Sequence, residues 1–92
     1  MNLQLKVKWC EALRSGEHKQ AHGMMFKDDR SCCLGVLAIV VGFSREQSGD
    51  AYEFIDTQIG RSGAERCIHR NDGIGMKKHT FEEIADFIES EL

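Results

Sequence analysis

The amino-acid sequence predicts a small α+β domain in which two or three helices pack on a short antiparallel sheet. Three observations support this fold class: an amphipathic pattern near the N-terminus, a capped amphipathic pattern at the C-terminus, and short apolar stretches separated by polar turns between them. The 92 residues correspond to a single globular domain, residues 1–92. Hydrophobic residues make up 41% and charged residues 29%, which is typical of a folded chain and not of a disordered one.

The first amphipathic pattern predicts a helix close to the N-terminus. Its apolar positions recur at helical spacing, and they are Leu5, Trp9, Ala12 and Leu13. Arg14 lies near the end of the pattern and Gly16 just beyond it, which is typical of a helix that a glycine terminates. We expect the only tryptophan, Trp9, to pack in the core.

A β-hairpin is predicted next. Residues Met24 to Phe26 favour a short strand, and the polar residues Lys27 to Arg30 follow them. The sequence becomes apolar again at Cys32. The simplest structure for this pattern is a hairpin with its tip at Asp28 and Asp29.

The segment from Cys33 to Val41 fits two structures. Its β-branched residues favour a strand. A possible cap at Ser31, a glycine at Gly42 and a length of nine residues favour a short buried helix. We prefer the helix because four apolar residues would share one face: Leu34, Leu37, Ala38 and Val41.

The middle of the chain gives weaker signals. Residues 44–50 are polar and predict a loop, and residues 52–55 contain aromatic and β-branched side chains that suggest a strand. Residues 60–63 predict a turn, and residues 66–69 suggest another short strand. Residues 71–75 form a glycine-rich loop without the pattern of a phosphate-binding loop.

The closing helix has the clearest start signal. Thr80 and Glu83 have the spacing of a capping box, in which each side chain bonds the backbone N–H of the other residue. The apolar stripe that follows consists of Phe81, Ile84, Ala85, Ile88 and Leu92. This stripe needs a cover, and the available partners are the helix that contains Trp9 and the segment of residues 34–41.

Net charge and hydropathy argue against some classes of function. The net charge of −3 gives no overall attraction to nucleic acid. The longest apolar run, Cys32 to Phe43, has about 12 residues, so no membrane span is expected. No export signal is visible at the N-terminus, which predicts a soluble protein inside the cell with reduced, structural cysteines.

Residue types that could bind metal or catalyse a reaction are present, but each also fits a structural role. The candidate ligands are His18, His22, Cys32, Cys33, Cys67 and His69. Their spacing matches no zinc motif, so no metal and no cofactor are expected, and a metal-stabilised accessory domain is a third hypothesis for the function. The carboxylate pair Asp28–Asp29 fits a turn and the pair Glu82–Glu83 fits a helix cap, so no catalytic residue is expected and the chain is not predicted to be an enzyme.

The remaining hypothesis is recognition of a macromolecule through charged loops. The expected partner-binding residues are those of the hairpin tip and a basic pair before the last helix: Lys27, Asp28, Asp29, Arg30, Lys77 and Lys78. A second basic group consists of Arg61, Arg66 and Arg70. Either basic group suits local contact with phosphates, although solvated charge is the simpler explanation.

Three segments resemble a recurrent family of small bacteriophage proteins. They are residues 9–16 with Gln20, the Cys-Cys-Leu-Gly-Val-Leu sequence of residues 32–37, and the Phe-Glu-Glu-Ile-Ala-Asp helix that starts at Phe81. Asn71–Gly73 resembles the turn that precedes the closing helix there, and the loop of residues 73–79 is longer than in the usual pattern. Most members are uncharacterised, so the resemblance carries over no catalytic residues.

Among phage proteins of this size and charge, the chain is also similar to anti-CRISPR proteins, in particular to the eighth family of type I-F inhibitors. This resemblance implies a phage-encoded inhibitor of host defence that acts in the host bacterial cytoplasm. It implies binding to the type I-F Cas–crRNA surveillance complex and blocked recognition of target DNA. The alternative is a small phage regulatory protein that binds nucleic acid.

Overall fold

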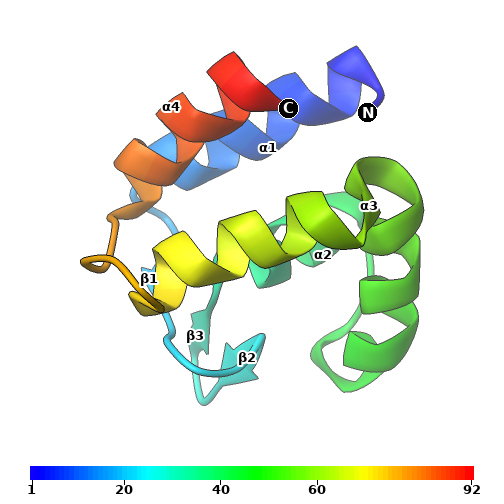
Figure 1. The fold of residues 1–92 in the computed structure, drawn as a ribbon. Coiled ribbons are helices and arrows are strands. Elements are labelled where there is room, and N and C mark those ends of the chain that lie inside the picture. The colour runs from blue at the N-terminus through cyan, green and yellow to red at the C-terminus, as the bar shows by residue number, and fades with distance from the viewer.

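Four α-helices, one 3-10 helix and three two-residue strands make up the computed structural model, which describes residues 1–92 (Figure 1). Their order along the chain is α1 (Leu3–Arg14), β1 (Lys19–Gln20), β2 (Phe26–Lys27), β3 (Arg30–Ser31), α2 (Cys33–Val41), η1 (Arg45–Gln47), α3 (Ser48–Asp72) and α4 (Phe81–Glu91). The α+β class is confirmed, with four helices where two or three were expected. None of the helices is both long and apolar enough to cross a membrane.

The sheet is mixed, whereas a wholly antiparallel one was expected. Strands β2 and β3 form the predicted hairpin, with Phe26 opposite Ser31. Strand β1 lies on the other side of β3 and runs parallel to it. Asp28, at the tip, has a φ of 55°, in the left-handed region that aspartate tolerates in tight turns.

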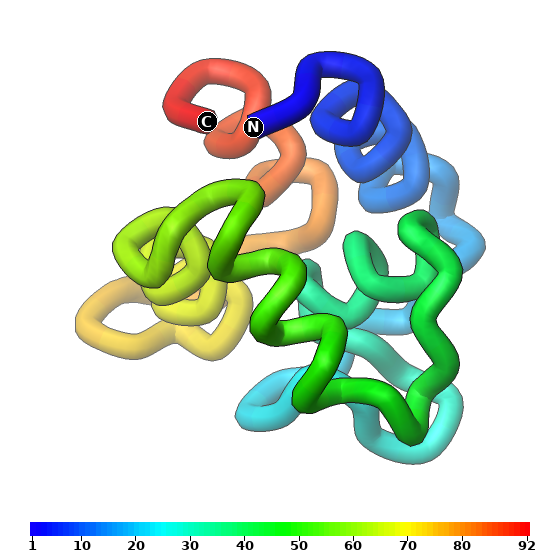
Figure 2. The backbone as a smooth tube through the Cα atoms, turned by 90° about the vertical axis from the view of Figure 1, so that its right-hand side faces the viewer, coloured from blue at the N-terminus to red at the C-terminus, as the bar shows by residue number.

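Helices α1 and α4 pack side by side, although they come from opposite ends of the sequence (Figures 1 and 2). Trp9 and Leu13 of α1 and Ile84 and Ile88 of α4 are buried in the same core cluster. The Cys10 thiol of α1 donates to the Ala85 carbonyl of α4 over 3.7 Å. The expected cover of the apolar stripe by the helix that contains Trp9 is therefore confirmed.

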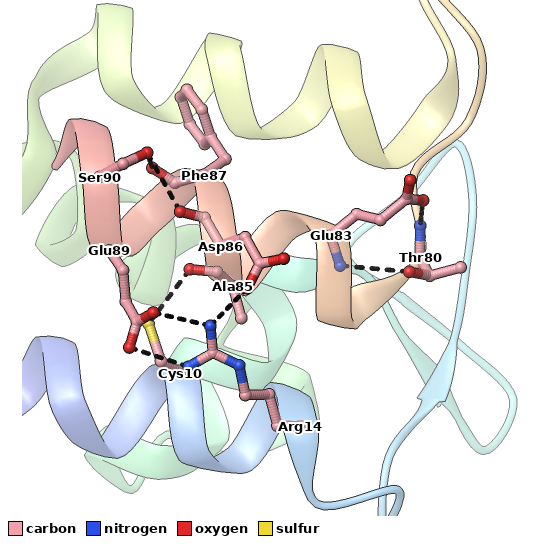
Figure 3. Close-up of polar contacts among 9 residues, drawn as sticks. All are labelled: Cys10, Arg14, Thr80, Glu83, Ala85, Asp86, Phe87, Glu89 and Ser90. Atoms are coloured by element: carbon pink, nitrogen blue, oxygen red, sulfur yellow. Dashed lines mark hydrogen bonds and ion pairs between the residues drawn. The ribbon is translucent and has the colours of Figure 1, made fainter.

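An ion-pair network joins α1 and α4 at the exposed edge of this helix pair. The Arg14 guanidinium bonds Asp86 at 2.7 Å and Glu89 at 2.8 and 2.9 Å (Figure 3). Two donor nitrogens on one carboxylate form a bidentate pair, which has a more defined geometry than a single contact. Arg14 thus fixes the position of α4 against the end of α1.

The segment Cys33–Val41 is a helix, as predicted. Its residues from Cys33 to Ala38 are all buried, so this helix forms the centre of the core. Gly42 ends it in a left-handed conformation with a φ of 112°, as expected. The N-cap is Cys32 and not Ser31, because Ser31 belongs to strand β3.

The largest error concerns residues 44–72. The expected loop of residues 44–50 contains η1 and the start of α3, and the expected strands and turn of residues 52–69 all lie within α3. Their buried positions, Ala51, Ile55, Ala64 and Cys67, have helical and not alternating spacing. At Gly60 the backbone leaves helical geometry, with φ 74° and ψ 163°, and the two halves of α3 run in different directions (Figure 1).

The capping box of α4 is present as predicted. The Glu83 N–H donates to the Thr80 hydroxyl over 3.2 Å, and the Thr80 N–H donates to the Glu83 carboxylate over 2.9 Å (Figure 3). The hydrogen bond from the Thr80 N–H holds the pKa of Glu83 below its ordinary value of 4.5. The charges of Lys77 and His79 lower this pKa further. The ionised Glu83 carboxylate therefore stabilises the fold at pH values above 4.5. This contribution is lost as the pH falls through the lowered pKa of the folded state.

We expect Glu83→Gln to lower the melting temperature at neutral pH by a few degrees at most, since this carboxylate is exposed. The difference from wild type should disappear in acid, where the wild-type carboxyl is also neutral. Thermal melts by circular dichroism at several pH values measure it. Glu53→Gln is the matched control, because the exposed Glu53 side chain makes no hydrogen bond; an equal acid-dependent effect there would contradict the assignment.

Candidate interaction surface

The hairpin tip, residues Lys27–Arg30, is exposed and is braced by a side chain from a distant element. Arg45, at the start of η1, donates to the Arg30 carbonyl over 2.9 Å and also to the Asp28 carbonyl. Its guanidinium lies 4.8 Å from the centre of the Phe26 ring, within the range of a cation–π contact. The Arg45 side chain thus bonds the backbone of the tip at Asp28 and Arg30, and it packs on Phe26 at the base of the hairpin.

Two further contacts fix the tip from the side of β1. The Lys19 ammonium lies 2.9 Å from the Asp29 carboxylate, and this pairing lowers the pKa of Asp29. The Arg30 guanidinium reaches the Gln20 carbonyl over 3.5 Å. A shallow polar hollow lies between β1 and the tip, and it is lined by Gln20, Ala21, His22, Lys27, Asp28 and Arg30.

Lys77 and Lys78 lie in the loop that joins α3 to α4, and both are exposed. The His79 N–H donates to the Arg70 carbonyl over 2.8 Å, which anchors the end of this loop on α3. Figures 1 and 2 show the loop and the hairpin tip at separate corners of the molecule. The six residues proposed as contacts from the sequence therefore form two surfaces and not one.

Arg66 and Arg70, from the second basic group, have structural partners. Their guanidinium groups lie 5.0 Å and 3.8 Å from the centre of the Phe87 ring of α4. Arg66 also pairs with Glu91 at 3.4 Å. These two arginines hold α3 against α4, and only Arg61 of this group is exposed.

Asn71, at the end of α3, bonds β1 and α2 inside the core, and the sequence analysis missed it. Its side-chain oxygen accepts from the Gln20 amide over 2.9 Å and from the Cys33 N–H over 3.2 Å. Its nitrogen donates to the Ala21 carbonyl and to Asp72, each over 2.8 Å. Asn71 lies four residues after buried Cys67, so the helical spacing would have placed it inside had the helix been recognised.

The candidate metal ligands do not converge. No group of three histidine, cysteine or acidic side chains is placed to hold a metal ion. The Asp28–Asp29 pair lies at the exposed hairpin tip, and Glu83 caps α4. These positions support the structural explanations of the same residues.

All four cysteines are free and buried. Burial raises the pKa of Cys10 above its ordinary value and raises that of Cys32 to about 11. The pKa of Cys33 is also raised, by its hydrogen bond with Cys67 and by burial. Cysteine nucleophiles act as thiolates, so protonated buried thiols fit a structural role.

We expect Cys32 in the native protein to react with iodoacetamide roughly 100-fold more slowly than a free cysteine, because its pKa is about 11 against an ordinary 9.0. Unfolding in guanidinium chloride should expose all four thiols to the reagent. Mass spectrometry of tryptic peptides measures the modification at each position. Rapid labelling of Cys32 in the native protein would contradict this burial.

The fold and the surface together define a small α+β domain that presents a braced, charged hairpin. Residues 1–54, more than half of the chain, match the family model described as a domain of unknown function, DUF8296. The chain therefore belongs to this family. The comparisons with curated proteins and with solved structures each gave no significant match.

Proposed function

We propose that this chain is a non-catalytic binding protein and that the hairpin tip contacts its macromolecular partner. The observation that carries the proposal is the brace formed by Arg45, which bonds the carbonyls of Asp28 and Arg30. Two-residue strands have too few ladder bonds to hold a hairpin rigid by themselves. The brace fixes the hairpin in the free protein, so little backbone entropy is lost when a partner binds there.

The charges of the tip suit a partner that contains both protein and nucleic acid. Lys27 and Arg30 are exposed cations, and Asp28 is an exposed anion next to them. Mixed charges of this kind set specificity and the rate of association more than affinity. A ribonucleoprotein offers phosphates for the cations and basic side chains for the anion.

We further propose, from the resemblance to phage inhibitors, that the partner is the type I-F Cas–crRNA surveillance complex. The protein would then act stoichiometrically in the cytoplasm of the bacterial host and prevent the complex from binding target DNA. The exposed charged tip and the small size of the domain support occlusion of a surface as the mode of action. This assignment of the partner depends on the resemblance, whereas the use of the hairpin depends on its geometry.

The test is to titrate the purified protein onto the surveillance complex and measure binding of labelled target DNA. We expect co-migration with the complex and loss of DNA binding near equimolar ratio. Lys27→Glu with Arg30→Glu should weaken the inhibition by about tenfold or more. The control is Lys8→Glu with Arg61→Glu, which changes the net charge equally at exposed positions on α1 and α3.

Unchanged DNA binding without co-migration would exclude this partner. Equal loss in the hairpin variant and the control would exclude the hairpin as the contact. A gel shift of DNA without the complex, at two salt concentrations, tests the alternative of a nucleic-acid-binding regulator. Direct binding that weakens steeply with salt would favour that alternative.

A further inference from the structure

A small pocket lies between the two halves of the bent helix α3, which diverge at Gly60 (Figure 1). The pocket has a volume of about 150 Å³, and both halves line it: Tyr52 belongs to the first half, and Ile68 and Asp72 belong to the second. The loop of residues 21–25 and the start of α2 supply further walls, which include Met24, Met25, Cys32 and Leu34. The bend in α3 therefore helps to form a pocket that a straight helix would not provide.

Apolar side chains set the size and the character of the pocket. Most of its walls consist of Met24, Met25, Leu34 and Ile68. A cavity of about this volume with apolar walls accommodates one benzene-sized group. Methionine walls adapt to the shape of a ligand, because the side chain is unbranched and polarizable. A ligand for this pocket therefore needs a compact hydrocarbon body.

The only charged side chain that lines the pocket is Asp72. Its Oδ1 accepts from the Gly23 N–H over 3.0 Å and from the Asn71 amide over 2.8 Å, which fixes the carboxylate in place. Its Oδ2 accepts no hydrogen bond within the chain, and Asp72 belongs to none of the ion pairs of the fold. Lys77 and Lys78 do not line the pocket. The pocket thus holds one negative charge, with an oxygen left for a cationic ligand.

One other polar group of the pocket is without a partner. The Tyr52 hydroxyl makes no hydrogen bond within the chain, so its oxygen can accept one from a ligand. The Asn71 amide is already engaged in hydrogen bonds inside the core. Burial keeps the Cys32 thiol protonated, so it adds no second charge. The free polar atoms of the pocket are therefore acceptors for a donor that carries positive charge.

We propose that this pocket binds a small organic amine, in which a protonated amino group is attached to a hydrocarbon body of about the size of benzene. The body packs between Met24 and Ile68, and the ammonium group donates to the Asp72 carboxylate and to the Tyr52 hydroxyl. Alkyl amines are protonated at neutral pH, as the lysine side chain is. Hydrogen bonds between two charged groups are stronger than neutral ones, so the carboxylate selects an amine over an alcohol.

The shape of the pocket favours a free amine over a lysine side chain of a partner protein. A compact ring makes contacts with the walls on all sides, whereas the thin, linear stem of a lysine leaves part of the volume unfilled and loses those contacts. The proposal depends neither on the hairpin nor on the partner proposed for it.

The test is a titration of the full chain with five small molecules, followed by methyl NMR. Benzylamine has the proposed body and charge. Benzyl alcohol has the same shape without the charge, benzoate reverses the charge, methylamine lacks the body, and Nα-acetyl-lysine amide represents the lysine of a protein. We expect benzylamine to shift the methyl signals of Met24, Met25, Leu34 and Ile68. The other four compounds should each bind at least about tenfold more weakly.

Two variants separate the contributions of the polar groups. Asp72→Asn keeps an oxygen that can accept from the Gly23 N–H and removes the charge; it should weaken benzylamine about tenfold and change benzyl alcohol less than about twofold. Tyr52→Phe removes only a hydroxyl that bonds nothing in the protein, so it should fold normally and weaken benzylamine about threefold. Glu53→Gln is the matched control, since it removes one negative charge at an exposed position of the same helix.

Absence of methyl shifts with benzylamine would overturn the proposal. Equal binding of benzyl alcohol, or equal weakening of benzylamine by Asp72→Asn and the control, would overturn the role of Asp72. Equal binding of Nα-acetyl-lysine amide would overturn the free amine in favour of a lysine from a protein partner. Failure of this test leaves the hairpin proposal standing, because none of the residues 27–30 lines the pocket.

Discussion

Asn71→Ala should lower the free energy of unfolding by about 3–5 kcal/mol. The Asn71 side chain is fully buried and bonds Gln20 of β1, the next residue Ala21, and Cys33 at the start of α2. Its removal leaves the Cys33 N–H and the Ala21 carbonyl buried without partners, and each such group costs about 1–3 kcal/mol. The amide also leaves a small cavity, which adds to the loss.

Urea denaturation followed by circular dichroism measures this difference. Gln4→Ala is the matched control, because Gln4 is exposed on α1 and its side chain makes no hydrogen bond. We expect the control to change stability by less than about 0.5 kcal/mol. A loss for Asn71→Ala as small as that of the control would show that the Asn71 hydrogen bonds contribute little.

Gly35→Ala should destabilise the protein by about 2–3 kcal/mol through overpacking. A Cβ atom at this position would lie 2.6 Å from the Met25 carbonyl oxygen and 3.1 Å from both the Phe26 ring and the Ser31 Cβ. The closest atom belongs to the backbone of Met25, directly before β2, which cannot move away as a flexible side chain would. The variant should therefore also displace the hairpin from α2.

Gly49→Ala is the matched control for this substitution. Gly49 lies in the first turn of α3, and a Cβ atom there meets no neighbour within 4 Å. Alanine should stabilise that helix by about 0.4–1 kcal/mol. Urea denaturation of both variants and NMR shifts of Lys27 and Arg30 provide the measurement; unchanged hairpin shifts in Gly35→Ala would contradict the expected displacement.

The elements that were predicted correctly are those whose ends carry local signals. The Thr80 capping box and Gly42 each mark a helix end by their own backbone chemistry. Helix α3 lacks such signals in its first half, since no side chain caps its start, and glycines interrupt its sequence. Its buried positions are mostly small, so the half-buried aromatic residues Tyr52 and Phe54 dominated the pattern.

The parallel pairing of β1 with β3 also could not be predicted from the sequence. Each strand contributes two residues, too few for an alternating pattern. The pairing is held instead by long-range contacts, such as that between Gln20 and Asn71. Side-chain hydrogen bonds between distant elements leave no periodic mark in a sequence.

The charged hairpin tip could be proposed from residue types alone, because turn formers and charges stood together between apolar stretches. The brace could not be predicted, because Arg45 lay in a segment that was expected to be a loop. Its contacts with Asp28 and Arg30 cross 15 or more positions of the chain. The sequence thus indicated where a surface lies, and the structure showed what makes it rigid.

The pairing of α1 with α4 has a consequence for synthesis of the protein. Contacts such as those between Arg14 and Glu89 join residues 75 positions apart. During translation, α1 is made before α4, and its Trp9 face remains without α4 until that helix emerges. Native closure of the core must therefore follow completion of α4, and a nascent chain halted in the 73–79 loop would expose Trp9 and Leu13 to chaperones and proteases.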